Sequence, residues 1–395
     1  MIVLTPPDHP LSDRGCHHSA MSIRVVVLGN GIVGASTAYH LAVRGASVTV
    51  IDRPRLGRAT DAGAGIVCPW VDHDGDDAWY RLALEGSRYY TTLAGLLAED
   101  GETDISHARV GALLVAEDPA ELATTEALLR GRAAAAPDMG RVGAVDRPAG
   151  LFPPLAPSLT ALFVPGAARV DGRVVRDALE RAAVRRGARV RGGAAALTPA
   201  GAPLLDGTAL DADAVVVAAG AWAGEVCAPI GLPVAVGPRR GQIVHAELPG
   251  LRTEGWPIVL PRRGPYLLGF PGSRVVLGAT VEDAGFDPRA TVGGVAEVLS
   301  GGARLAPGLK EATIVETRSG LRPVTGDGRP LLGALGGHAA NVVVATGLGA
   351  YGLTAGPYMG MIAACLALGE RPPLDVTPFS ADPAERERDT LLEAG

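Results

Sequence analysis

The chain has 395 residues, 47% of them hydrophobic, and a formal net charge of −6. This composition can fill a large core and excludes wholesale disorder, and the length suits two domains or one domain with an inserted lobe. The charge is not gathered into a basic or acidic block, so the electrostatic surface of a nucleic-acid-binding protein is absent. We expect a globular protein with no nucleic-acid partner.

The first 21 residues contain two adjacent prolines, acidic residues and a histidine pair, but not the charged start and apolar run of a signal peptide. We expect a flexible tail at 1–21, a second tail at 373–395 and a cytoplasmic protein. The cysteines are too far apart for a disulfide framework or a zinc site, and no metal site is predicted. They are Cys16, Cys68, Cys227 and Cys365.

Residues 24–52 read as strand, turn, helix and strand. The turn is Gly29-Asn30-Gly31-Ile32-Val33-Gly34. In this context the spacing is a dinucleotide-binding fingerprint. Gly29 permits the tight turn, Gly31 lets the backbone approach a pyrophosphate, and Gly34 lets the helix pack on the strand. The helix N-terminus adds free N–H groups and a partial positive charge.

The second strand of this unit ends at Asp52, which is placed to accept hydrogen bonds from a ribose, with Arg53 next to it. An acid at this position favours a free ribose over a 2′-phosphate. The fingerprint alone does not separate FAD from NAD.

Three short apolar strands, each ending in glycine, are expected at 24–29, 214–220 and 341–347. Runs of this kind suit a parallel sheet covered on both faces. Between them, residues 76–150 read as helices and 231–317 contain strand-like pieces. We predict an α/β fold (α+β overall), with a Rossmann-like nucleotide-binding domain formed by 22–75, 151–230 and 318–372. The insertions 76–150 and 231–317 would build a second, mixed-sheet domain for the substrate.

The stretch from Asn341 to Gly369 has no charged residue and is long enough to cross a membrane. However, a β-branched run at Val342–Val344 is followed by several glycines and Pro357. This pattern predicts a strand, a glycine loop and a helix, and no transmembrane segment.

The C-terminal part carries the most specific string. It reads Gly320-Leu321-Arg322-Pro323-Val324-Thr325-Gly326-Asp327-Gly328, and continues to Thr346-Gly347 and Gly352-Leu353-Thr354. Together with Gly220-Ala221-Trp222, it resembles the D-amino-acid oxidase family, which includes glycine oxidase, sarcosine oxidase and bacterial D-amino-acid dehydrogenase. The resemblance spans about residues 22–372 and implies an FAD cofactor. The cofactor should be noncovalent, because Gly320 replaces the cysteine that links flavin in sarcosine-oxidase-like members.

The resemblance implies FAD contacts from the fingerprint, a small-residue loop at 59–66, the second strand motif and the C-terminal glycine loop. In that small-residue loop, Asp61 replaces the usual serine or neutral amide. The helix beginning near Thr354 would place a second positive helix end near the flavin, whereas the alternative is a buried helix with glycines only for packing. The expected contacts are Gly29, Gly31, Ile32, Val33, Gly34, Asp52, Arg53, Thr60, Ala64, Gly65, Ile66, Ala196, Gly220, Trp222, Gly347, Gly349, Ala350, Tyr351, Gly352, Leu353 and Thr354.

Three residues are catalytic candidates. Arg322 matches the arginine that grips the substrate carboxylate, which a planar guanidinium can hold by two hydrogen bonds. The alternative is a surface arginine paired with Asp327. Tyr266 matches an active-site tyrosine of glycine-oxidase-like sequences, and Tyr351 would line the pocket. For both tyrosines, core packing is the alternative.

The resemblance implies an FAD-dependent oxidoreductase that oxidises the C–N bond of a D-amino acid or glycine-like amine. Hydride transfer to flavin N5 would give an imine that hydrolyses, with O2 or another electron acceptor as the second partner. Val276 stands where sarcosine-oxidase-like members place a lysine, and the string around Arg322 is similar to the D-amino-acid dehydrogenase branch. Alternatives are a secondary-amine (sarcosine-like) or biosynthetic amino-acid oxidase, and a non-catalytic FAD-binding assembly factor.

Overall fold

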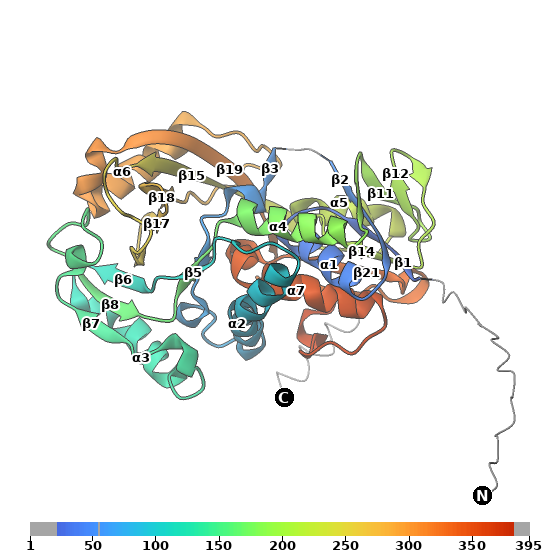
Figure 1. Ribbon diagram of the computed structural model, residues 1–395, viewed down its shortest axis with the longest axis horizontal. Coiled ribbons are helices and arrows are strands. Elements are labelled where there is room, and N and C mark those ends of the chain that lie inside the picture. The colour runs from blue at the N-terminus through green and yellow to red at the C-terminus, as the bar shows by residue number, and fades with distance from the viewer. Residues whose placement is uncertain (1–21, 54–55, 383–395) are drawn as a thin grey trace, which may run out of the picture.

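The computed structural model describes residues 22–53 and 56–382. At its centre is a six-stranded sheet in the order β10-β2-β1-β14-β21-β20 (Figure 1). All neighbours are parallel except β20 and β21. The three glycine-ended strands of the sequence analysis therefore lie side by side, and the predicted α/β fold is confirmed. The strands are β1 (Arg24–Leu28), β2 (Ser47–Asp52), β10 (Arg189–Gly192), β14 (Ala214–Val217), β20 (Leu331–Ala334) and β21 (Val342–Thr346).

Alternate residues of the central strands face two different cores. Val25 and Val27 of β1 pack with residues of α1 (Ile32–Val43), α4 (Gly172–Arg185) and α7 (Gly352–Ala367). Val26 and Leu28 face the opposite core. Burial on both faces explains why these strands are continuously apolar. The opposite core is covered by β11 (Ala195–Leu197), β12 (Pro203–Leu205), β13 (Thr208–Ala209) and α5 (Ala223–Cys227).

The glycines of the uncharged C-terminal stretch let α7 approach α1 closely. A Cβ on Gly360 would lie 2.6 Å from Val33 O, and one on Gly356 would lie 2.7 Å from Ile32 Cγ2. The Ser36 hydroxyl donates to the Pro357 carbonyl at 2.6 Å, which satisfies a backbone acceptor inside this contact. The prediction of strand, loop and helix for this stretch is confirmed.

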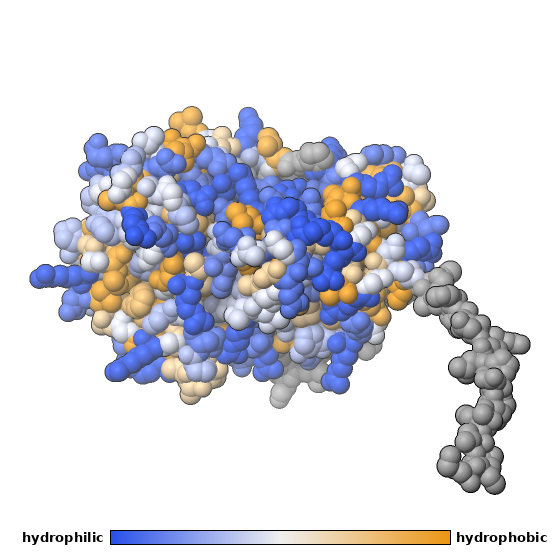
Figure 2. All heavy atoms as spheres, viewed as in Figure 1, coloured by the Kyte–Doolittle hydropathy of each residue, from blue (hydrophilic) through white to orange (hydrophobic). Residues whose placement is uncertain are grey.

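No helix in the described ranges is long and apolar enough to span a bilayer. On the face of the molecule in Figure 2, hydrophobic side chains are scattered among hydrophilic ones.

A nine-stranded mixed sheet forms the second part of the molecule, on the left in Figure 1. Its order is β3-β19-β15-β18-β17-β16-β6-β8-β7, and two pairs, β16 with β6 and β19 with β3, are parallel. One face packs on α6 (Val292–Leu305), and α3 (Ala123–Arg132) lies near the other. The strands are β3 (Gly57–Arg58), β6 (Ala112–Ala116), β7 (Gly143–Val145), β8 (Thr160–Val164), β15 (Val236–Glu247), β16 (Ile258–Pro261), β17 (Tyr266–Phe270), β18 (Arg274–Gly278) and β19 (Thr313–Thr325).

Three details differ from the sequence analysis. Residues 76–150 contain α2 (Asp77–Glu99) and α3 but also β6, a fully buried strand with no alternation to mark it. Strand β8 belongs to the nine-stranded sheet, although the predicted boundaries assign 151–230 to the nucleotide-binding part. The predicted tail at 373–395 is wrong for 373–382, because Phe379 and Ala381 are buried. The predicted tail at 1–21 and the rest of the C-terminal one lie outside the described residues.

A small antiparallel sheet also connects distant segments of the chain. It consists of β4 (Ile66–Val67), β5 (Ala108–Arg109) and β9 (Ala168–Arg169), in the order β4-β9-β5. Because β4 begins at Ile66, the last residue of the small-residue loop 59–66, this pairing fixes the end of that loop.

Candidate active site

A cavity of about 410 Å³ lies at the carboxyl edge of the six-stranded sheet and continues to the nine-stranded sheet. Its wall includes the segments that follow β1, β14 and β21, and also residues of β15, β17 and β19. Ligands of open α/β sheets bind at this edge, and the size suits a small-molecule site.

The fingerprint turn lies at one part of the cavity. Gly29 has φ +104°, and a Cβ on it would lie 2.5 Å from Ala218 O, so only glycine fits. Helix α1 begins here with no acidic residue in its first turn and no side-chain cap at Gly31. The Ile32 N–H donates to Thr60 Oγ1 at 2.9 Å, which joins the helix start to the small-residue loop. The remaining amides of the first turn suit an anion.

Asp52 lies on the cavity wall with an arginine that the sequence analysis did not single out. The Asp52 carboxylate accepts from the Asn30 N–H at 3.2 Å and from Arg58 Nη2. Arg58 also lines the cavity and donates to Asp61 at 3.1 Å. Asp61 itself is not part of the cavity wall, since its carboxylate turns to Arg58 and Arg176.

The start of α7 lies on the same cavity. This helix has no acidic residue in its first turn and no side-chain cap. The loop before it turns through Gly347 (φ +85°) and Gly349 (φ +53°). The Thr354 hydroxyl donates to Ile66 O at 3.0 Å, and thereby ties α7 to the small-residue loop. Two uncapped helix N-termini on one cavity form a cradle that fits a ligand with a pyrophosphate and a second electron-rich group, as FAD has.

Little room remains around Gly320, the position at which sarcosine-oxidase-like sequences have a flavin-linking cysteine. A Cβ on Gly320 would lie 2.8 Å from the Ala62 Cβ and 3.2 Å from Ala59 Cα. The cavity also includes Cys68, a thiol that is 2% exposed. Burial raises the pKa of Cys68 to about 12, so the thiol carries its proton at neutral pH.

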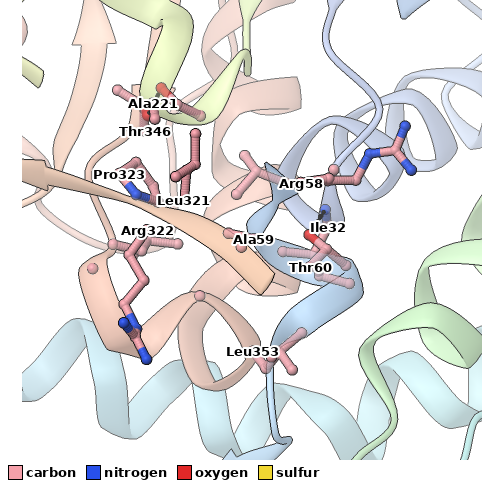
Figure 3. Close-up of a pocket in the computed structure, with 18 of the residues that line it drawn as sticks. Ile32, Arg58, Ala59, Thr60, Ala221, Leu321, Arg322, Pro323, Thr346 and Leu353 are labelled. Atoms are coloured by element: carbon pink, nitrogen blue, oxygen red, sulfur yellow. Dashed lines mark hydrogen bonds between the residues drawn. The ribbon is translucent and has the colours of Figure 1, made fainter. Parts of the chain in front are cut away.

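At the other end of the cavity, the Arg322 guanidinium has no acidic partner among the described residues. Its Nη1 donates to two backbone carbonyls, Thr280 O at 3.2 Å and Arg240 O at 3.3 Å. No carboxylate of residues 22–53 and 56–382 forms an ion pair with it, so the predicted alternative of a pair with Asp327 is not found. Figure 3 shows Arg322 and Arg58 pointing away from each other on either side of Ala59.

Tyr266 faces the same end of the cavity as Arg322. It pairs with Gly278 across β17 and β18, and a Cβ on Gly278 would lie 3.1 Å from the Tyr266 hydroxyl. Burial raises the pKa of Tyr266, while the charge and hydrogen bonding of Arg322 act in the opposite direction. The tyrosine is therefore a neutral hydrogen-bonding group beside the Arg322 guanidinium.

Tyr351 lines the cavity and also packs against other rings. Its hydroxyl donates to Asp72 Oδ2 at 2.5 Å, and its ring lies 4.4 Å from the ring of His73 and 5.6 Å from that of Trp79. Burial, followed by the charge of Asp72, raises the pKa of Tyr351 well above its usual value. Tyr351 thus lines the cavity and is also a packed aromatic residue, which are the two interpretations given in the sequence analysis.

The structure brings nearly all the candidate residues onto one cavity. Two expected FAD contacts do not line it. Gly34 packs instead against Gly29, where a Cβ would lie 1.9 Å from the carbonyl oxygen, and Ala196 is not on the wall although its neighbour Ala195 is. The residues that sequence reasoning missed include Arg58, Asp72 and Gly241, for which no local motif gives a signal.

A family model described as FAD dependent oxidoreductase, DAO, matches residues 24–366. The chain belongs to this family. It is 44% identical over 368 residues to the uncharacterized oxidoreductase YurR of Bacillus subtilis, covering 91% of this chain and 98% of that protein. It is 29% identical to the glycine oxidase of Geobacillus kaustophilus, covering 90% of this chain and 96% of that protein.

Solved structures give the same result. The iminodiacetate oxidase of Chelativorans sp. BNC1 superposes with a TM-score of 0.88 at 45% identity, covering 91% of this chain and 99% of that one. The glycine oxidase of Geobacillus kaustophilus gives a TM-score of 0.80 at 28% identity, over 91% and 99% of the two chains. The protein is therefore an FAD-dependent oxidoreductase of the kind that acts on amino acids or amines.

Proposed function

We propose that this protein oxidises the C–N bond of a small amino acid, either glycine-like or of the D configuration, whose carboxylate binds Arg322. The observation that carries the proposal is the guanidinium of Arg322 on the cavity wall, which has no carboxylate partner among the described residues and lies next to the Tyr266 hydroxyl. A partly buried cation without a carboxylate is costly, and a substrate carboxylate would neutralise it.

In this proposal FAD is held noncovalently by Gly29, Gly31, Asp52 and the two helix starts at Ile32 and Gly352. Bound FAD supplies the two-electron acceptor for the oxidation. The amides of α1 would face the pyrophosphate, and Asp52 would accept hydrogen bonds from a ribose. The chain's other contribution is to orient the substrate and to exclude water around it.

Arg322 and Tyr266 would fix the substrate at its carboxylate. Two carbonyls hold Nη1 of Arg322, so Nη2 remains to bind the carboxylate together with the Tyr266 hydroxyl. The Tyr266 hydroxyl, the Tyr351 hydroxyl and the Cys68 thiol have raised pKa values and keep their protons near neutral pH. These groups therefore donate hydrogen bonds, and the substrate amine must lose its proton before it is oxidised.

A second candidate substrate is a secondary amine that carries N-carboxymethyl groups. It is favoured by the 45% identity to a protein named for iminodiacetate oxidation. Asp72 bears on this choice, because it also lines the cavity and its negative charge would repel a second substrate carboxylate nearby. We therefore rank substrates with one carboxylate first.

The test is anaerobic mixing of the purified holoprotein with glycine, D-alanine, sarcosine and iminodiacetate, followed by flavin absorbance. We expect bleaching by at least one single-carboxylate substrate. Bleaching by iminodiacetate alone would establish the second candidate. The absence of bleaching by every α-amine would contradict both and favour a non-catalytic FAD-binding protein. Peroxide measured in air after reduction then identifies whether O2 is the electron acceptor.

A further inference from the structure

The two carbonyls that hold Arg322 come from different segments that a single acidic side chain joins. Arg240 lies in β15, and Thr280 lies just after β18. Arg240 and Glu282 exchange both backbone hydrogen bonds at 2.9 Å, and Thr280 N donates to Gln242 O at 3.2 Å. The segment 280–282 is therefore an extra bridge across the middle of β15, which leaves the Arg240 and Thr280 carbonyls directed at Arg322.

The Glu282 side chain holds this bridge together by accepting hydrogen bonds from three residues. It accepts from Arg240 Nη2 at 2.6 Å, from Gln242 Nε2 at 2.7 Å and from the Thr280 hydroxyl at 2.5 Å. Gln242 and Thr280 are each only 1% exposed, so water cannot replace this acceptor for them. Burial acts to raise the pKa of Glu282, but these hydrogen bonds and the charge of Arg240 outweigh it and lower the pKa, so the group is an anion.

We infer that Glu282 is a positioning residue for the Arg322 clamp, because it fixes the two backbone acceptors that orient the guanidinium. The inference rests on the proposed function, in which Arg322 binds the substrate carboxylate. Glu282 itself is not part of the cavity wall, so it acts through Arg240 and Thr280. A glutamine at this position has one acceptor oxygen and an NH2 group that would oppose one of the three donors, so the bridge must shift.

The test compares Glu282→Gln with Asp283→Asn as the matched control. Asp283 is the next carboxylate of the same segment, but its side chain is exposed and pairs with Arg239, which supplies neither of the carbonyls that accept from Arg322. The probe is glycolate, which has the carboxylate of glycine and lacks the amine, titrated against the flavin absorbance of the holoprotein. We expect the glycolate Kd to rise about tenfold in Glu282→Gln and to stay unchanged in Asp283→Asn.

A double-mutant cycle with Arg322→Ala separates the inference from the proposed function. We expect Glu282→Gln to add no further loss once Arg322 is absent, and to raise KM more than it lowers kcat in the presence of Arg322. FAD content and circular dichroism report folding. Should Glu282→Gln fail to fold, Glu282→Asp is used in its place, with an expected loss of roughly fivefold because the shorter carboxylate cannot reach all three donors.

Each outcome has one meaning. An unchanged glycolate Kd in the Glu282 variant overturns the positioning role and leaves the proposed function standing. The positioning role is also overturned if Glu282→Gln raises the glycolate Kd by the same factor in the Arg322→Ala background as in the wild type. The effect of Glu282 would then not pass through Arg322. An unchanged Kd in Arg322→Ala alone overturns the proposed clamp, and the inference with it.

Discussion

The guanidinium of Arg322 occupies the space that a side chain at position 241 would fill. A Cβ on Gly241 would lie 2.2 Å from Nη1 of Arg322 and 2.4 Å from its Cζ. Gly241 does not have a positive φ and lies inside β15, so its backbone tolerates any residue. The requirement for glycine at this position is therefore set by the arginine and not by the strand.

This contact predicts a selective defect in Gly241→Ala. The methyl group should push the guanidinium out of its place, so KM for the amino-acid substrate should rise by about tenfold or more with little change in thermal stability. Gly237→Ala is the matched control, because it lies in the same strand and has no atom near its Cβ position. Equal steady-state kinetics for the two variants would contradict the contact.

The Asp52 carboxylate leads to a prediction about FAD affinity. Its removal in Asp52→Ala should raise the FAD Kd about tenfold, because a ribose loses a charged acceptor. The measurement is a fluorescence titration of the apoprotein. Asp61→Ala serves as the control, since Asp61 also accepts from Arg58 but is not part of the cavity wall. If Asp61→Ala raised the FAD Kd more than Asp52→Ala, the pairing of Arg58, and not contact with the nucleotide, would set the affinity for FAD.

The space around Gly320 predicts that FAD is not covalently linked. A side chain at this position would meet Ala62, and the nearby Cys68 thiol has its pKa raised to about 12 and is a poor nucleophile. Acid precipitation should therefore release all the flavin into the supernatant, where chromatography identifies it. Flavin that stays with the precipitate, but not with that of Cys68→Ala, would show a link through Cys68.

Short sequence patterns predicted the part of the site whose residues are close together in the sequence. The fingerprint at Gly29 and Gly31 acts within one strand–turn–helix unit, so its spacing alone placed it. Arg322 came from the resemblance and not from a pattern, since an arginine in a strand can have many roles. The structure places the fingerprint glycines and Arg322 on one cavity. Their roles in binding are tested by the experiments above.

The missed features depend on pairing between distant segments. Gly241 matters only because β15 pairs with β19, which places it opposite Gly320 and diagonal to Arg322. Strand β6 was missed because its five residues are all buried between neighbouring strands, which removes the alternation that marks a strand. Neither register nor two-sided burial can be inferred from the residues of one segment.

The protonation of Tyr266 gives a prediction about pH. Burial raises the pKa of its hydroxyl, and the opposing effect of Arg322 is smaller, so the proton stays on the hydroxyl up to about pH 10. The glycolate Kd should therefore be constant from about pH 7 to pH 10, since the glycolate carboxylate does not titrate in that range. Tyr266→Phe should weaken binding roughly fivefold at every pH, because it removes one hydrogen bond to a charged group. Binding that fails between about pH 8 and 10 in the wild type, but not in Tyr266→Phe, would mean that the hydroxyl ionises there and repels the carboxylate.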